Sequence, residues 1–459
     1  MTEKLQRLMK DIPVVRWVAL VLLALLMFFG YMFMDVLSPL QSLLESTKGW
    51  TPETYGTFMS SEYFLNVFAF FLIFAGIILD KTGIRFSIIL SAGLMLFGAL
   101  IKYYAISDYF VGSGLESALS SWWVAFPPSA KLASLGFMIF GCGVEMAGVT
   151  VSKAIVKWFK GKELALAMGI EMAIARLGVF AVFSLSPRLA AGIDVSKPVL
   201  FCTLLLVIGF ICILTYCFMD RKLDKQLGES GIEPDDPFKF SDIGKLFSSK
   251  TFMIVAFLCV LYYSAIFPFQ KFAANMLECR LGITNQAASD IFRWFPIGAM
   301  VLTPLLGAFL DNKGKGATML MLGSILMLCC HLVFALTPEQ YFTKGVAYAA
   351  ILLLGVSFSL VPAALWPSVP KLVENRYLGT GYSVIFWIQN IGLMVFPMLI
   401  GWALTTTNQG VTNPTDYNYT VPMLIFASLG LLALLLSILL KAEDKKKGYG
   451  LELPNIEKK

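Results

Sequence analysis

Long apolar stretches separated by short polar ones recur along the whole chain. About twelve of them reach roughly 20 residues, the length an α-helix needs to cross the hydrocarbon core of a bilayer. Lipid offers the backbone no hydrogen-bond partner, so each stretch is predicted to be helical. The pattern predicts an all-α membrane protein whose transmembrane helices lie at about 14–37, 55–79, 86–105, 131–152, 164–190, 198–219, 251–272, 287–310, 317–336, 344–366, 378–404 and 421–441.

The composition agrees with this pattern. Of the 459 residues, 58% are hydrophobic and 14% are charged, whereas a soluble domain has about 25% charged residues. The first apolar run starts at Val14 and lacks a small-residue cleavage site, so we interpret it as a helix that is retained. The cysteines show no CxxC or Cys/His spacing, and we predict no metal site, disulfide framework or cofactor. The net charge of +6 does not indicate a nucleic-acid partner.

Lysine and arginine are distributed unevenly between the two sides of the predicted helices. The two termini and every second loop hold 26 of the 36 basic residues, and the other side holds 8. The positive-inside rule therefore predicts that both termini are cytoplasmic. The N-terminal region has no acidic dileucine signal, and the outer side has a single glycosylation sequon, at Asn418. Both features favour a bacterial inner (plasma) membrane over a lysosome.

A hydrophilic stretch in the centre of the chain divides the predicted helices into two groups of six. It contains the segment GESGIEPDDPF, which is rich in glycine, proline and acidic residues and is typical of a linker. We predict an N-terminal six-helix half at 1–219, a cytoplasmic linker at 220–250, a C-terminal six-helix half at 251–441 and a cytoplasmic tail at 442–459.

A short motif occurs once in each predicted half, in the loop between its second and third helices. A glycine at the helix end allows close helix approach, an aspartate accepts hydrogen bonds, and a second glycine permits a tight turn. The repeat supports two related halves. Its first copy consists of Gly76, Asp80, Lys81, Gly83 and Arg85, and its second copy of Gly307, Asp311, Gly314 and Lys315, with Asn312 in place of the first base.

The fourth and fifth spans carry charged residues in otherwise apolar sequence, namely Glu145, Glu171 and Arg176. An unpaired charge inside a bilayer costs from about 3 to more than 10 kcal/mol, so such residues normally face a partner or a water-filled cavity. Glu145 is predicted at roughly 10 Å from the cytoplasmic end of its span and Arg176 at roughly 18 Å, given 1.5 Å per residue. This arrangement suits a zwitterion whose amine meets Glu145 and whose carboxylate meets Arg176. The alternative is a permanent ion pair that only joins two helices.

Two further carboxylates have several possible roles. Glu171 lies five positions before Arg176 and so points about 140° away from it on a helical wheel. Structural pairing and function are equally compatible with that position. Glu62, toward the outer half of the second span, either lines the cavity, carries a proton or makes a helix contact. Both are candidate proton sites.

In the second half, polar and aromatic residues cluster in two spans. Tyr262 and Tyr263 in the seventh span either bond to a ligand or pack between helices. The eleventh span carries Trp387, Gln389 and Asn390, which are the best second-half candidates for polar contacts with a ligand.

The repeated loop motif resembles the signature of the major facilitator superfamily, G-x-x-x-D-[RK]-x-G-x-[RK]. That resemblance implies twelve helices in two pseudo-symmetric halves. It also implies a gating role, not a substrate contact, for the cytoplasmic loop residues Asp80 and Asp311 and their neighbours Gly76, Gly83 and Arg85. Longer stretches are similar to the major facilitator superfamily domain-containing protein 1 group, namely Lys157–Leu164, Ala175–Gly178, Tyr262–Phe269, Ala364–Pro367 and Leu378–Leu393.

That group includes lysosomal dipeptide uniporters. The resemblance implies that Glu145 and Arg176 hold the two ends of a peptide, that Asp35 matches a further acidic position, and that at least one of the two tyrosines faces the cavity. The chain departs from the group's pattern at Glu62 and Glu171, where the group carries neutral residues. These two carboxylates leave the charge preference and proton coupling open.

We therefore predict an alternating-access transporter of small zwitterionic peptides that works as a uniporter and is not an enzyme. Its expected partners are a small peptide and the lipid bilayer, and a monomer is sufficient for this function. The alternatives are a proton-coupled carrier of another small organic solute, and a membrane receptor or scaffold that transports nothing.

Overall fold

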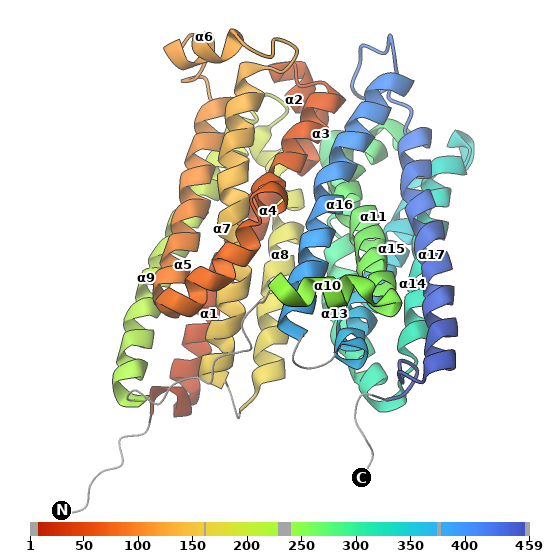
Figure 1. Ribbon diagram of the computed structural model, residues 1–459. Helices are drawn as coiled ribbons and strands as arrows, with labels where there is room; N and C mark the ends of the chain where they lie inside the picture. The colour runs from red at the N-terminus through yellow and green to blue at the C-terminus, as the bar shows by residue number, and fades with distance from the viewer. Residues whose placement is uncertain (1–7, 160–161, 228–239, 374–377, 455–459) are drawn as a thin grey trace, which may run out of the picture.

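The computed structural model describes residues 8–159, 162–227, 240–373 and 378–454. Within these ranges the chain is almost entirely helical and contains no β-strand (Figure 1). Its elements are η1 Met9–Asp11, α1 Pro13–Met34, η2 Ser38–Leu40, α2 Gln41–Lys48, α3 Pro52–Ser61, α4 Phe64–Phe68, α5 Phe71–Ile106, α6 Gly114–Ser120, α7 Pro128–Phe159, α8 Leu164–Ala190, α9 Ser196–Leu227, α10 Phe240–Ser248, α11 Lys250–Leu281, α12 Asn285–Phe292, α13 Phe295–Lys313, α14 Gly316–Leu336, η3 Glu339–Tyr341, α15 Lys344–Leu372, α16 Leu378–Thr407 and α17 Thr420–Lys447.

These elements form the twelve predicted membrane crossings, which confirms the predicted fold. Two crossings are broken. The second consists of α3, α4 and the start of α5, and the eighth consists of α12 and α13. The element α5 runs on from the second crossing into the third. The two crossings are separated at Gly83, where the backbone leaves helical geometry with a φ of +80°. Eleven helical segments of the described chain are individually long and apolar enough to span a bilayer.

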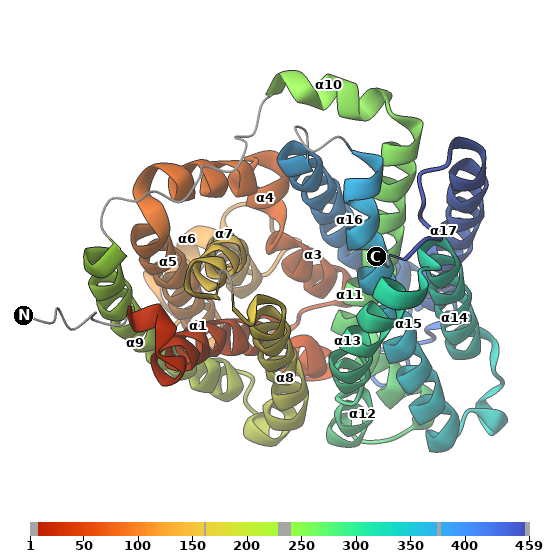
Figure 2. The ribbon, with the colours of Figure 1, turned by 90° about the horizontal axis from the view of Figure 1, so that it is seen from below.

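The helices form two bundles that lie side by side (Figures 1 and 2). We call α1 to α9 the first half and α11 to α17 the second half. In the first half α5 packs against α7 and α9, while α1 packs against α8 and α9. In the second half α14 packs against α15 and α17, and α11 packs against α16 and α17. Segment 228–239 of the predicted linker lies outside the described residues, and the predicted boundaries of the halves stay a prediction.

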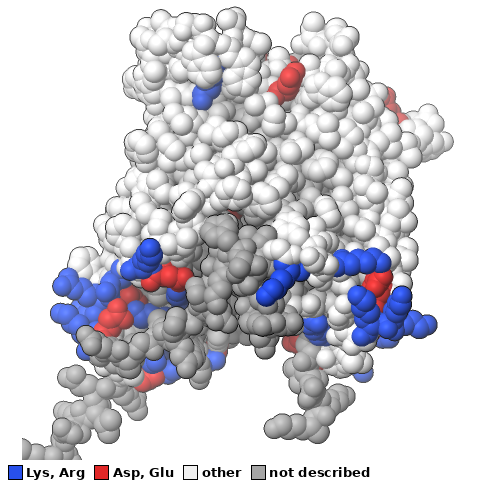
Figure 3. Space-filling model, viewed as in Figure 1, with Lys and Arg blue, Asp and Glu red and all other residues white. Residues whose placement is uncertain are grey.

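Charged side chains gather at one end of the molecule (Figure 3). On the face shown, most of the lysine and arginine lies at the lower end, and a wide band above it is almost free of charge. We call this the basic end. It is the end at which α1 begins and α7 and α17 finish (Figure 1). The opposite end is called the far end.

The two halves meet tightly at the far end. There α3 of the first half packs against α16 of the second. A side-chain carbon added at Gly56 would overlap the backbone of Pro397, and one added at Gly401 would overlap the backbone of Pro52. Hydrogen bonds and ion pairs that join described residues of the two halves lie at this end or near mid-membrane. Examples are the hydrogen bonds Ser42–Glu278, Tyr55–Lys271, Asn285–Pro39, Tyr417–Glu45, Tyr419–Gln41 and Trp387–Val67.

The close packing of α5 and α7 depends on a glycine and leads to a prediction. A Cβ at Gly98 of α5 would overlap the backbone of Gly136 and Phe140 in α7, whereas one at Gly93 of α5 meets nothing within 4 Å. Gly98→Ala should therefore destabilise the protein by about 1–3 kcal/mol, the usual cost of overpacking. Thermal unfolding of detergent-purified protein should show a lower transition temperature for Gly98→Ala and no decrease for Gly93→Ala. Equal transition temperatures would contradict this account of the packing.

Candidate functional site

Glu145 and Arg176 lie at nearly the same depth in the first half. Glu145 precedes the end of α7 by about 14 residues, or roughly 21 Å, and Arg176 follows the start of α8 by about 12 residues, or roughly 18 Å. Counted from these helix ends, the two residues differ by about 3 Å along the helix axes, whereas the predicted span limits of 152 and 164 give about 8 Å. The reason is that α7 continues to Phe159 and not to residue 152.

Side-chain contacts explain why α7 is longer than its apolar run. The Lys153 ammonium lies 2.7 Å from Oδ1 of Asp80, and that of Lys157 lies 2.8 Å from Oδ1 of Asp220. The Trp158 indole also donates a hydrogen bond to Asp220, over 3.1 Å. The last turns of α7 are thus held by polar contacts that a hydrophobicity pattern does not record.

The three charged residues of the fourth and fifth crossings are accessible in mid-membrane. Glu145, Glu171 and Arg176 are each half-buried. Among the described residues, no ion pair joins Glu145 to Arg176, and neither has another ion-pair partner. A permanent structural pair is therefore absent from this conformation. The Tyr31 hydroxyl of α1 lies within electrostatic range of all three charges.

Arg176 contacts an aromatic side chain of the other half. Its guanidinium carbon lies 4.6 Å from the ring centroid of Phe358 in α15, a cation–π contact. Tyr31, Tyr263 and Glu171 lie within electrostatic range of it. Glu171 is therefore near Arg176 although the helical wheel separates them. Within the described chain Arg176 donates no hydrogen bond, so its fork of N–H groups remains free to bind a carboxylate.

Two of the predicted second-half residues share this accessible environment. Tyr263 is half-buried, and its hydroxyl accepts a hydrogen bond from the indole of Trp366 over 3.1 Å. Trp387 is half-buried too, and it reaches across to the first half, where it donates to the Val67 carbonyl over 3.0 Å. Its ring stacks on Phe70 with centroids 5.4 Å apart.

The other three predicted second-half residues are buried within that half. The Tyr262 hydroxyl bonds to Ser357 of α15. Gln389 accepts a hydrogen bond from the Cys259 thiol over 3.3 Å, and Asn390 is 2% exposed. The structure therefore separates Tyr262, Gln389 and Asn390 from the accessible set, and any role for them in ligand binding stays a prediction.

Asp35 lies in a different place from Glu145 and Arg176. It follows the end of α1 and is fully buried. Its Oδ1 accepts hydrogen bonds from Ser38 over 2.8 Å and from the Lys271 ammonium over 3.0 Å, and its Oδ2 accepts one from Gln270. Lys271 and Gln270 belong to α11, so Asp35 joins the two halves by an ion pair. Both of its oxygens are engaged, and substrate binding by Asp35 stays a prediction that this geometry does not favour.

Glu62 lies beside this ion pair. It occupies the break between α3 and α4, is 1% exposed, and its Oε2 is 3.7 Å from the Lys271 ammonium. Among the described residues, neither carboxylate oxygen of Glu62 has a hydrogen-bond partner. The backbone at Glu62 packs directly on Gly141 of α7, where any side chain would overlap it.

The sequence did not lead us to consider Lys271 and Lys102 as functional residues. Both were counted only among the eight basic residues on the outer side of the membrane. Both are buried, at 2% and 0% exposure. A signal was present, since both residues fell inside the predicted spans 251–272 and 86–105. A lysine inside an apolar span indicates a buried partner for the same physical reason as Glu145 does.

The repeated loop motif lies at the basic end, apart from the charged residues in mid-membrane. Asp80 pairs with Lys153, and Arg85 pairs with Asp224. Gly83 adopts its positive φ between the second and third crossings. Gly76 has open space around it, and Asp311 lies near the end of α13. These first-half ion pairs stay within the first half, and the gating role of the motif stays a prediction.

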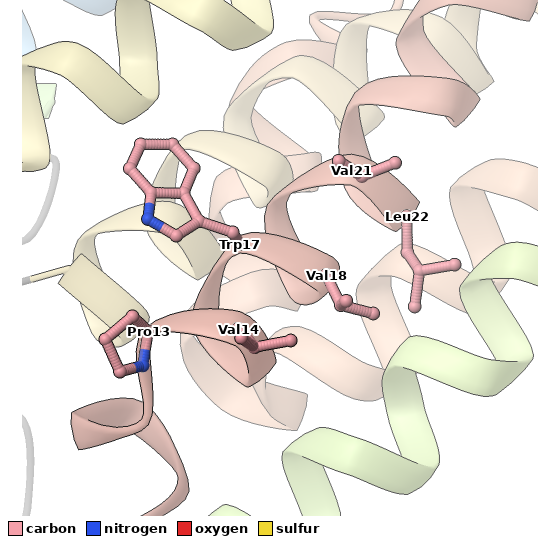
Figure 4. Close-up of a pocket in the computed structure, with 6 residues that line it drawn as sticks. All are labelled: Pro13, Val14, Trp17, Val18, Val21 and Leu22. Carbon is pink, nitrogen blue, oxygen red and sulfur yellow. The ribbon is translucent and has the colours of Figure 1, made fainter.

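An apolar depression on α1 is not a candidate for this site. Figure 4 shows that its six lining residues all lie along one side of that single helix and that none is charged. In the described part of the chain, no group of three or more His, Cys, Asp or Glu side chains is placed to hold a metal ion. The depression is lined by Pro13, Val14, Trp17, Val18, Val21 and Leu22.

Comparison with known proteins assigns a family and a fold. Residues 23–397 and 280–454 match the sequence profile of the Major Facilitator Superfamily. The chain is 28% identical over 450 residues to the lysosomal dipeptide transporter MFSD1 of Danio rerio, covering 95% of this chain and 89% of that protein. It is 29% identical over 344 residues to the protein of the same name from Bos taurus, covering 72% of this chain and 68% of that protein.

Solved structures show the same fold at low sequence identity. A mutant of the nucleoside transporter NupG superposes with a TM-score of 0.72 at 14% identity, covering 92% of this chain and 99% of that one. A D-xylose-proton symporter superposes with a TM-score of 0.65 at 13% identity, covering 93% and 97%.

The buried pair Asp35–Lys271 leads to a second prediction. Loss of one partner of a buried ion pair costs about 3–5 kcal/mol, so Asp35→Asn should loosen the far end. The reporter is Leu40→Cys, in the η2 segment that packs on α11 and is 1% exposed. Labelling of this cysteine by a membrane-impermeant maleimide from the far side should become severalfold faster in Asp35→Asn, after subtraction of the background from the parent protein.

The matched control is Asp290→Asn. Asp290 also joins the halves, through Arg188 at 3.0 Å, but this pair is partly exposed. An exposed pair contributes about 0–1 kcal/mol, so labelling should change little. Equal labelling rates in the two aspartate variants would overturn the assignment of Asp35 as the main ionic contact at the far end.

Proposed function

Because the chain belongs to the Major Facilitator Superfamily, we propose that it is an alternating-access transporter of small zwitterionic peptides, and a uniporter. The observation that carries this proposal is the pair Glu145 and Arg176. They lie at the same depth in mid-membrane, are half-buried, and within the described chain have no ion-pair partner. The similarity to proteins named dipeptide transporters supports the choice of ligand.

The chemistry of the two residues suits the two ends of a dipeptide. The planar guanidinium of Arg176 binds both oxygens of a carboxylate, and Glu145 accepts hydrogen bonds from an ammonium. Tyr31 and Tyr263 flank Arg176 and provide hydroxyl groups nearby. A ligand without one charged end leaves one protein charge unpaired in a poorly solvated site, which disfavours its binding.

Substrate access follows from the contacts between the halves. The resolved contacts lie at the far end and near mid-membrane, so we interpret this conformation as one that receives the ligand from the basic end. The bound zwitterion neutralises Arg176 and Glu145, which lowers the cost of enclosing both charges when the halves rock about the site. The gate that closes the basic end is proposed to depend on the loop motif, namely on Asp80, Arg85 and Asp311 and on the motif's glycines.

The basic end is proposed to be cytoplasmic, with both termini on that side, in a bacterial plasma membrane. The excess of lysine and arginine at that end supports the orientation. The two moving bodies are the six-helix halves 1–219 and 251–441, connected by the linker 220–250 and followed by the tail 442–459. One chain contains the complete site, so a monomer is sufficient.

A proton-coupled carrier of a small organic solute is the second candidate. It is favoured by Glu62, a buried carboxylate whose oxygens lack a hydrogen-bond partner among the described residues, with half-buried Glu171 as a further proton site. Proteoliposomes with an internal pH dye distinguish the two. Uniport of a dipeptide without change of internal pH is expected, whereas acidification that is lost in Glu62→Gln or Glu171→Gln favours coupling.

The main test is dipeptide uptake into proteoliposomes by variants of equal abundance. Glu145→Gln and Arg176→Ala should each lower uptake roughly a hundredfold, because each removes a charge-assisted contact of up to ~3 kcal/mol. Matched controls from the same half are Glu116→Gln, on the exposed helix α6, and Arg188→Ala, at the edge of the far end. Both should transport at nearly the parent rate.

The ligand side of the same test uses peptide chemistry. Free dipeptides should raise the thermal unfolding temperature of the parent protein, and dipeptides capped at either end should not. Unchanged uptake in Glu145→Gln and Arg176→Ala, or stabilisation by doubly capped peptides, would exclude the proposed ligand clamp.

A further inference from the structure

Lys102 occupies an unusual environment in the first half. Its side chain is fully buried near the end of α5, and within the described chain its ammonium has no hydrogen-bond partner. Instead the ammonium lies 4.0 Å from the ring centroid of Phe137, 4.6 Å from that of Phe33 and 5.1 Å from that of Phe58. Three aromatic faces stabilise a cation without forming any hydrogen bond to it.

This lysine lies near the two carboxylates that bind Lys271. The charges of Asp35, Glu62 and Lys271 all act on Lys102 over electrostatic range. Conversely, the charges of Lys271 and Lys102 both act on Glu62. In the present conformation Lys271 forms the ion pairs, at 3.0 Å to Asp35 and 3.7 Å to Glu62.

The four charges are divided unequally between the moving halves. Asp35, Glu62 and Lys102 belong to the first half, and Lys271 belongs to α11 of the second. When the far end opens in an alternating-access cycle, Lys271 departs with α11. Two carboxylates then remain, and Lys102 is a buried cation of their own half whose charge acts on Glu62. A buried carboxylate without a cation is costly.

We infer that Lys102 is a reserve counter-cation, a positioning residue that leaves its aromatic cage to pair with Glu62 and Asp35 whenever Lys271 withdraws. The inference rests on the proposed alternating-access function. The aromatic cage suits this role because it holds the ammonium without hydrogen bonds. The ammonium can therefore leave without breaking a hydrogen bond, and only apolar rings remain behind it. The exchange lowers the cost of the open far end and so allows the transport cycle to proceed.

The test measures opening of the far end by maleimide labelling of Leu40→Cys, with no substrate needed. Lys102→Met should slow labelling about tenfold or more, because the opened state then contains carboxylates without a cation. Lys102→Arg keeps the charge and should label at close to the parent rate. The matched control is Lys131→Met, which removes a lysine of the same half whose ammonium donates to the backbone carbonyls of Leu119 and Trp122.

A double variant separates the charge role from simple packing. Glu62→Gln removes one of the carboxylates that Lys102 would serve, so Glu62→Gln/Lys102→Met should regain most of the labelling rate. A lysine that only fills space would not be rescued in this way. If Lys102→Met folds poorly, Lys102→Gln also removes the charge and should slow labelling to a similar extent.

The outcomes distinguish this inference from the proposed substrate. Parent-like labelling in the neutral Lys102 variant, or no rescue in the double variant, would each overturn the role of Lys102. Stabilisation of Lys102→Met by free dipeptides should remain, because Glu145 and Arg176 are intact. Absence of any dipeptide effect in the parent protein would count against the proposed ligand and not against the counter-cation.

Discussion

The high cost of a charge in apolar surroundings explains most of what is specific about this chain. Helices are required throughout because lipid satisfies no backbone polar group, and the few charges within them must be paired, caged or hydrated. The structure contains all three solutions. Asp35 is paired with Lys271, Lys102 is caged by aromatic rings, and Glu145 remains half-buried in an accessible position.

Glycine allows the helices to bring these charges together. Gly141 lets α7 touch the backbone at the break between α3 and α4, which places Glu62 against the first-half core. Gly56 and Gly401 permit contact of α3 with α16 at the far end. These contacts use backbone surface without side-chain interdigitation, so two surfaces of this kind can separate and rejoin with few rotamer changes. The far end is tightly closed in this conformation.

The sequence was sufficient to predict the twelve crossings, because each must satisfy its backbone within an apolar span of known length. It also singled out Glu145 and Arg176 as candidate site residues, since a charge in such a span is conspicuous, and their role stays a prediction. It placed the end of α7 too early, because Lys153 and Lys157 extend the helix through ion pairs with distant aspartates. The pairing of Asp35 with Lys271 depends on contacts between residues more than 200 positions apart, which no local pattern contains.

The two groups of charges differ in a way that suggests separate tasks linked by electrostatics. Among the described residues, the mid-membrane group is partly exposed and has no ion pair, which suits the proposed ligand site. The far-end group is buried, and Asp35 and Glu62 pair there with Lys271, which suits a closed gate. Glu145 acts on Glu62 over electrostatic range, and Tyr31 lies within range of charges from both groups. On the proposed function, a bound zwitterion neutralises the first group and so changes the potential at the second. Because electrostatic interactions in a poorly solvated interior are weakly screened, the proposed ligand would act on the far-end charges without any chain of mechanical contacts.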